Sequence, residues 1–181
     1  MSQSPCSANV AIIGAGVVGL ALAYELSRGG LRVVVVERDR VGAGASGVAA
    51  GMLAPASEAA TEDEALLDLA LQSCALYPEF VQSVEEISGM NCQYRTEGTL
   101  LIALHRDHVE ELEHLARRQA ILGLTTRWLS AREVLELEPS LTARVTGGLL
   151  AEGDRQVNPR ALVAALAKAV ERLGGDRKSV V

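Results

Sequence analysis

The first forty residues alternate apolar runs with glycine in a way that predicts a strand, a helix and a second strand. Residues 10–13 and 31–36 are almost continuously apolar. Such runs are typical of parallel strands that are covered on both faces. Between them, residues from about 17 to 28 are apolar nearly all round, which predicts a helix buried between a sheet and another layer. Gly29 and Gly30 end this helix.

The rest of the chain mixes helical periodicity with shorter apolar runs. Thr61-Glu-Asp-Glu64 has the form of a capping box, so we expect a helix to begin there, with Pro78 breaking or restarting it. The further elements that we expect are a strand at 99–104, an amphipathic helix at 106–122, a helix capped by Ser130 and ended by Pro139, a strand at 145–151, and a helix from Asn158-Pro159 to Leu173.

A third parallel strand should follow the last helix, because a doubly wound sheet needs the chain to return to it. The residues after Gly174-Gly175 are Asp-Arg-Lys-Ser-Val-Val, which are too charged for a buried strand, so we expect this strand to be missing. Residues 176–181 also match what one frame of a common sequencing adapter encodes. We therefore hypothesise a truncated reading frame with a non-native tail at 176–181, and a naturally frayed polar tail is the alternative.

Three glycines after the first apolar run are spaced as in dinucleotide-binding turns. Gly14 would allow the tight turn, Gly16 would let N–H groups approach a pyrophosphate, and Gly19 would let the helix sit against the strand. The phosphates would lie at the helix N-terminus, where unpaired N–H groups and the helix dipole favour negative charge. Glu37 ends the second run, where a carboxylate binds ribose hydroxyls and repels a 2′-phosphate, which leaves FAD or NAD. The competing interpretation is a nucleotide-free turn that uses its glycines only for packing.

Charge and cysteine usage narrow the classes of partner. The 181 residues carry a formal net charge of −6 without long runs of Lys or Arg, which argues against nucleic acid or an anionic membrane as partner. Glycines interrupt the uncharged stretch from Ser2 to Tyr24, so we interpret it as a buried strand and helix, not a membrane span or leader. Three widely spaced cysteines fit neither a disulfide framework nor a zinc site, which favours a cytoplasmic location. His105, His108 and His114 lie on a solvated helix, and we expect no metal site.

The segment from residue 37 to residue 55 carries a more specific pattern. It reads Glu-Arg-Asp-Arg-Val-Gly-Ala-Gly-Ala-Ser-Gly-Val-Ala-Ala-Gly-Met-Leu-Ala-Pro. This segment resembles the D-amino-acid oxidase family of FAD-dependent oxidoreductases and, within it, the glycine oxidases of thiamine biosynthesis. The resemblance continues through residues 97–102, 136–139, 147–150 and 157–159. A complete member of the family is about twice as long as this chain.

The resemblance implies which residues would contact FAD. They are Gly14, Gly16, Val17, Val18 and Gly19 for the pyrophosphate, Glu37 for the adenosine ribose, Arg38 for the adenine side, Ala45 and Ser46 for the phosphate–ribityl region, and Ala50, Gly51 and Met52 for the isoalloxazine ring. A second glycine-rich loop suits an extended flavin that needs main-chain donors, and NAD enzymes do not require one. FAD is therefore preferred to NAD.

The resemblance also implies a reaction. The family oxidises an amine: a hydride leaves the α-carbon of glycine or another small amino acid, water hydrolyses the imine to a 2-oxo acid and ammonia, and oxygen is reduced to hydrogen peroxide. A D-amino-acid or sarcosine-type FAD oxidase or dehydrogenase stays open as an alternative, and so does an NAD-binding module without oxidase activity. In the family an Arg and a Tyr bind the substrate carboxylate, and both come from the half that this chain lacks. We nominate no catalytic residue.

The fold class that we predict is α/β: an incomplete Rossmann-like FAD-binding domain with an inserted α+β portion of a substrate domain. The ranges are 1–60 for the FAD-binding unit, 61–90 for a helical segment of the same domain, 91–152 for the partial substrate domain, 153–175 for the returning helix and 176–181 for the tail. We expect the polypeptide alone to be inactive and to hold FAD weakly or not at all. The full-length protein could form a homo-oligomer.

Overall fold

The computed structural model describes residues 7–58 and 64–179, which divide into two compact units. The first unit contains Met1–Gly51, Pro78–Tyr94 and Val157–Val181, and the second contains Met52–Tyr77 and Arg95–Gln156. The units therefore divide the predicted helical segment 61–90 at Pro78. The division of the chain into FAD-binding and substrate portions stays a prediction.

The first unit is built on a parallel three-stranded sheet. Its strands are β1 (Val10–Ile13), β2 (Val33–Glu37) and β8 (Asp176–Ser179), in the order β1-β2-β8. The expectation that a third strand is missing was wrong, because residues 176–179 pair in parallel with β2. Pairing needs only main-chain N–H and C=O groups, which the free edge of β2 offers whatever the side chains are.

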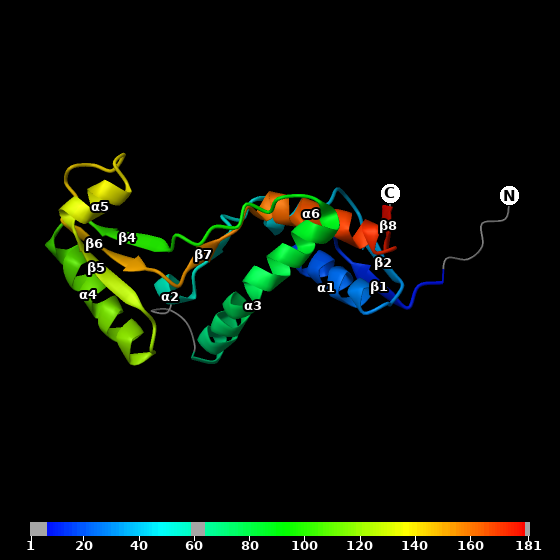
Figure 1. Cartoon of the computed structure of the whole chain (residues 1–181), viewed down its shortest axis with the longest axis horizontal. Coiled ribbons are helices and arrows are strands. Elements are labelled where there is room, and N and C mark those ends of the chain that lie inside the picture. Colours follow the sequence, from blue (N-terminus) through cyan, green and yellow to red (C-terminus); the bar gives the residue numbers. More distant parts are fainter. Residues whose placement is uncertain (1–6, 59–63, 180–181) are drawn as a thin grey trace. The chain divides into compact units, whose positions relative to one another are not determined.

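Helices α1 (Val17–Arg28) and α6 (Pro159–Arg172) lie side by side in this unit (Figure 1). Right-handed crossovers from β1 to β2 and from β2 to β8 place both helices on the same face of the sheet. The core between them contains Leu20, Ala23, Tyr24, Val33, Val35, Leu162, Leu166 and Val170, all buried.

The opposite face of this sheet is less covered than the sequence predicted. Ile13 is 91% exposed, and Val34 and Val36 of β2 are only half-buried. Helix α1 is likewise not buried all round, because Val18 is 80% exposed and Leu22 is 50% exposed. Both described helices that pack on the sheet lie on one side of it, so the strands and α1 each bury one face.

Helix α3 (Glu64–Ser88) runs without interruption through Pro78, so the predicted break there was wrong. An interior proline removes one helical hydrogen bond and costs about 3 kcal/mol. Burial of Leu67 before the proline, and of Val81 and Val84 after it, favours the helix on both sides. Residues 61–63 of the predicted capping box lie outside the described residues.

The second unit contains an antiparallel sheet in the order β4-β6-β5 and a short antiparallel ribbon of two strands. The sheet strands are β4 (Thr99–Ala103), β5 (Thr126–Ser130) and β6 (Gly147–Ala151), and the ribbon strands are β3 (Met52–Leu53) and β7 (Arg155–Gln156). Strand β5 was not predicted. Its Thr126, Arg127 and Ser130 are polar, and only Leu129 is buried, so the segment lacks an apolar run.

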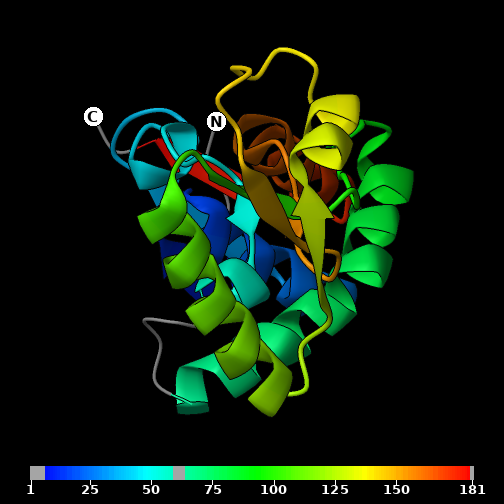
Figure 2. The same ribbon diagram turned by 90° about the vertical axis from the view of Figure 1, so that its left-hand side faces the viewer.

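Helices α4 (Arg106–Ile121) and α5 (Ala131–Leu137) pack beside the strands of this sheet (Figure 2), and α2 (Pro55–Glu58) follows β3. The predicted cap of α5 is present: Ser130 Oγ accepts from Glu133 N, and the Glu133 carboxylate accepts from Ser130 N. The core of this unit forms around Leu129, Val134 and Val145.

Within residues 7–58 and 64–179, no helix is both long and apolar enough to cross a membrane.

Candidate functional site

The turn between β1 and α1 brings the backbone of Gly14 close to the backbones of Val36 and Gly19. Gly14 has φ +101°, a conformation that favours glycine, and its N–H donates to Val36 O over 2.8 Å. A Cβ on Gly19 would lie 2.1 Å from Gly14 O, so only glycine lets α1 begin this close to the turn. The two glycines thereby set the N-terminus of α1 at the end of β1.

The N-terminus of α1 is open on the side of this turn. Gly16 occupies the N-cap position and offers no side-chain cap. The Val17 N–H instead donates to Ser46 Oγ over 2.9 Å, although Ser46 lies 29 residues along the chain. The first-turn N–H groups of a helix have no carbonyl partner within the helix and attract anions. This end of α1 therefore has the properties of a phosphate site, with Ser46 beside it.

The Glu37 carboxylate connects the end of β2 to the glycine turn. One oxygen accepts from Ala15 N over 2.7 Å and the other accepts from Asp39 N over 2.9 Å. The bond from Ala15 N is the largest cause that lowers the pKa of Glu37, and the bond from Asp39 N is the next. Glu37 is therefore ionised at neutral pH, and each oxygen keeps a lone pair for a further donor such as a ribose hydroxyl.

A cavity of about 640 Å³ lies at the carboxyl ends of β1 and β2. Its lining residues are Ile13, Gly14, Gly16, Val36, Glu37, Arg38, Asp39, Ala43, Gly44, Ala45 and Ser46. Six predicted cofactor residues therefore meet in one place: Gly14, Gly16, Glu37, Arg38, Ala45 and Ser46. The carboxyl edge of a parallel sheet is where α/β folds bind ligands, and the volume suits a nucleotide-sized group.

Other predicted residues lie outside this lining. Val17 and Gly19 belong to the first turn of α1, and Val18 beside them is largely exposed. Ala50 is exposed, and Gly51 closes a loop rather than lining the cavity. Met52 is 50% exposed and begins β3 in the second unit.

Sequence reasoning missed several residues of the lining. Asp39, Ala43 and Gly44 were not singled out, and neither were the apolar ends Ile13 and Val36. Their position in the sequence was the available signal: Asp39 follows Arg38 directly, and Ala43-Gly44 lead into Ala45. Small side chains leave the main chain of such a loop accessible at several positions, here at Ala43, Gly44 and Ala45.

The residues present fit a bound dinucleotide. Backbone N–H groups at the start of α1 can hold phosphates, and Glu37 lies across the turn from them, where it can accept from a ribose. A Cβ added to Gly14 or Gly44 would meet nothing within 4 Å, which leaves space above both segments. Among residues 7–58 and 64–179, no group of three or more His, Cys, Asp and Glu side chains is placed to hold a metal ion.

Comparison with known proteins assigns this arrangement to a family. Residues 9–178 match the model of the DAO family, described as FAD dependent oxidoreductase. The glycine oxidase of Geobacillus kaustophilus is 36% identical over 167 residues, which are 92% of this chain and 44% of that protein. The bifunctional protein ThiO/ThiG of Trichormus variabilis is 38% identical over 92% of this chain and 25% of its own length.

Solved structures agree with this match. The crystal structure of the Geobacillus kaustophilus glycine oxidase superposes with a TM-score of 0.87 at 35% identity, over 95% of this chain and 46% of that one. The glycine oxidase of Bacillus cereus gives a TM-score of 0.88 at 29% identity over 96% and 46%. The chain spans less than half the length of these relatives. With a family match over nearly all of its residues, this chain belongs to the DAO family of FAD-dependent oxidoreductases.

Proposed function

We propose that this chain forms the nucleotide-binding part of an FAD-dependent oxidoreductase that acts on glycine or another small amino acid or amine. One observation carries the proposal: the open N-terminus of α1, the ionised Glu37 and the Ser46 hydroxyl meet at one cavity. This set supplies phosphate donors and a ribose acceptor at one cavity. Family membership favours FAD over the alternative of an NAD-binding module.

The proposed roles follow the geometry. The first turn of α1 would hold the pyrophosphate, Glu37 the adenosine ribose and Arg38 the adenine side, with Ala45 and Ser46 at the phosphate–ribityl region. Ala50, Gly51 and Met52 would lie against the isoalloxazine ring. When bound, FAD would supply a hydride acceptor for the substrate α-carbon.

The reaction that we propose is oxidative deamination to the 2-oxo acid with ammonia, with oxygen reduced to hydrogen peroxide. The names of two relatives support it, because the proteins of Geobacillus kaustophilus and Bacillus cereus are both glycine oxidases. A role in thiamine biosynthesis is supported by the name of a further relative, the putative thiamine biosynthesis oxidoreductase ThiO of Rhizobium etli. The free thiols of Cys74 and Cys92 favour the cytoplasm as its location.

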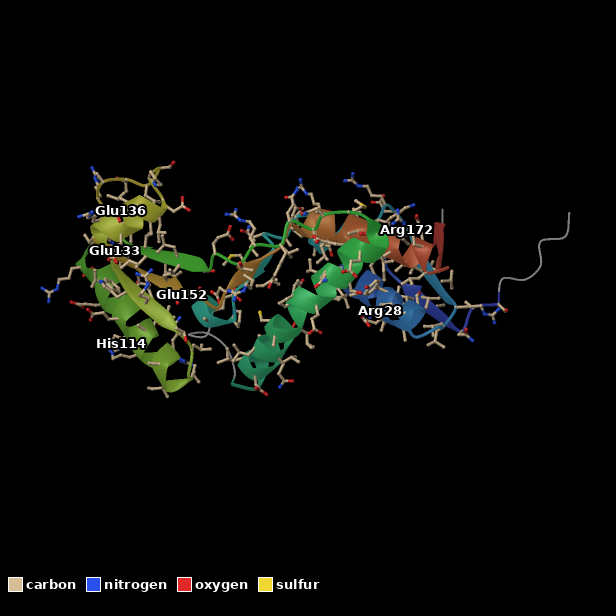
Figure 3. All side chains as sticks on the ribbon, viewed as in Figure 1. Arg28, His114, Glu133, Glu136, Glu152 and Arg172 are labelled. Carbon is tan, nitrogen blue, oxygen red and sulfur yellow. The ribbon has the colours of Figure 1, made fainter. Side chains whose placement is uncertain are left out.

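We propose that residues 1–181 alone do not turn over substrate. A carboxylate substrate needs a guanidinium that can make two parallel hydrogen bonds. Arg95 is paired with Glu97, and Arg127 is paired with Glu133 and Glu152, both labelled in Figure 3. Arg160 donates to a backbone carbonyl. All three arginines therefore already have a partner within the chain.

A titration tests the proposal. The purified chain is titrated with FAD and separately with NAD, and binding is followed by flavin fluorescence and by calorimetry. We expect weak but saturable binding of FAD, with no comparable binding of NAD. Gly16→Val is the matched variant, because its side chain would fill the space that Ser46 Oγ borders at 3.2 Å, and it should abolish binding. Equal affinity for NAD, or FAD binding that Gly16→Val leaves unchanged, would refute the proposed site.

Peroxide release then tests the reaction. The intact gene product is assayed with glycine, sarcosine and D-alanine, which separates a glycine oxidase from its D-amino-acid and sarcosine-type alternatives. Residues 1–181 should release no peroxide with any of the three.

A further inference from the structure

The loop from Ala45 to Gly51 contains few side chains that could hold it in shape. Its first three residues form the short helix η1 (Ala45–Gly47), and Val48 and Ala49 each donate to Ala45 O. Val48 is 82% exposed. The loop is therefore not stabilised by burial of its own side chains, and contacts from elsewhere must fix it.

One such contact is the bond from Val17 N to Ser46 Oγ, and two more come from the start of α6, more than a hundred residues away. Arg160 Nε donates to Gly47 O over 2.8 Å, and Val157 N donates to Gly51 O over 3.0 Å. Gly51 has φ +82°, and a Cβ on it would lie 2.0 Å from Val157 O. The loop is thus held at its middle by one side chain and at its end by main chain.

The start of α6 is itself firmly held. Asn158 Oδ1 accepts from Arg160 N and Ala161 N, each over 3.1 Å, and Pro159 occupies the first helical turn. Asn158 N donates to Cys92 O over 3.1 Å, and the same residue's amide donates to Gln93 Oε1. The backbone of Arg160 is therefore fixed. Its side-chain bond to Gly47 O in turn restricts where the loop can lie.

We propose that Arg160 is a positioning residue for the cofactor loop: it holds Ala45–Gly51 in the shape that FAD requires, through the Gly47 carbonyl. The importance of this loop for FAD rests on the proposed function. The contact itself does not, since it exists between two parts of the first unit. A loop that is ordered before binding loses less conformational entropy when the cofactor binds, so less of the binding free energy is spent on ordering it.

The same helix provides a matched control. Arg172, at the other end of α6 and labelled in Figure 3, donates to Ile87 O over 2.7 Å. It is an arginine on the same helix, also bonded to a backbone carbonyl, but its acceptor lies in the last turn of α3 and does not belong to the cofactor loop. A merely structural effect of losing such a bond would appear in both variants.

Amide hydrogen exchange of the chain without ligand tests the contact. Arg160→Gln is expected to accelerate exchange of the Gly47, Val48 and Ala49 amides about tenfold, while the amides of β1 and β2 stay protected. Arg172→Gln should leave the loop amides unchanged. Arg160→Lys keeps the charge without the planar Nε–H and should give a smaller increase. Unchanged loop exchange in Arg160→Gln, or an equal increase in Arg172→Gln, would overturn the proposal.

A flavin titration tests the link to the cofactor. Arg160→Gln should weaken FAD binding about five- to tenfold, and Arg172→Gln should leave it unchanged. Faster loop exchange with unaltered FAD affinity would refute the positioning role for the cofactor. If the unsubstituted chain binds no FAD, the proposed function of this chain fails, while hydrogen exchange still decides whether Arg160 holds the loop.

Discussion

The two glycine-rich segments of the first unit are held by contacts of different range. The turn at Gly14–Gly19 is fixed by its own neighbours: Gly14 N donates to Val36 O, and Gly19 lies against Gly14 O. The Ala45–Gly51 loop is bonded to α1 through Ser46 and is fixed in addition from Val157 and Arg160. The first segment is complete once a strand, a helix and a second strand have formed, whereas the second also needs α6 in place.

Because of this difference, we expect substitutions in the two segments to have different effects. Damage to the turn should affect the fold of the unit, because α1 starts there. Damage to the loop should affect its local order and the cofactor, with less effect on the sheet. The two segments meet at the bond from Val17 N to Ser46 Oγ, and Gly42 N, which precedes the loop, donates to Ala15 O over 3.0 Å.

The largest effect is expected from Gly19→Ala. Its Cβ would lie 2.1 Å from Gly14 O, so α1 must move away from the turn, and we expect unfolding free energy to fall by about 3 kcal/mol. Urea unfolding followed by circular dichroism measures this. Gly44→Ala is the control, since a Cβ there meets nothing within 4 Å. A Gly19→Ala chain as stable as Gly44→Ala would contradict the role of the turn.

Gly51→Ala should cost less in global stability, about 2 kcal/mol, because an exposed loop can shift where a helix cannot. Its φ of +82° and the approach of Val157 O both oppose a side chain. Limited proteolysis should show faster cleavage within 45–51, with the sheet still intact by hydrogen exchange. Loss of sheet protection together with the loop would show that the two segments do not fail separately.

Ser46→Ala removes the acceptor for Val17 N and should cost about 1 kcal/mol, as the loss of a helix cap does. Ser46→Thr keeps the hydroxyl and serves as the control. The measurement is the urea midpoint of both variants. Equal midpoints would mean that the bond from α1 to the loop contributes nothing to stability.

The smallest expected effect is on how stability depends on pH. The lowered pKa of Glu37 means that the folded chain binds its proton less readily than the unfolded chain does. The stability from Glu37 is therefore present above the ordinary glutamate pKa of about 4.3 and is lost as pH falls through the lowered value. Glu37→Gln should flatten the fall of the urea midpoint between about pH 5 and about pH 3, a range that contains the ordinary glutamate pKa. Glu97 and Glu133, whose pKa values are also lowered, keep part of the slope. An unaltered slope would contradict the ionic role of Glu37.

The sequence predicted the local parts of the fold well. The elements β1, α1 and β2 follow from apolar runs and glycines within forty residues, and the caps at Ser130 and Asn158 follow from short motifs. Their stabilising contacts lie between residues close in the chain. The glycine turn could be predicted as a candidate phosphate site for the same reason, because its glycines lie within six residues of each other.

The elements that sequence reasoning missed depend on partners elsewhere. Strand β8 forms from polar residues because β2 offers an open edge, and β5 forms beside β6 with one buried side chain. Pro78 lies within a helix because packing on both sides offsets its cost. The bond from Arg160 to Gly47 spans 113 residues and leaves no periodic signal.

The central claim is that FAD binds where the N-terminus of α1, Glu37 and Ser46 meet. The most direct measurement is an NMR titration of the chain with FAD that follows backbone amide shifts. The largest changes are expected at Ala15–Gly19 and at Gly44–Ser46, with little change in α4 and α5. Saturable FAD binding whose shifts fall outside these two segments would contradict the account.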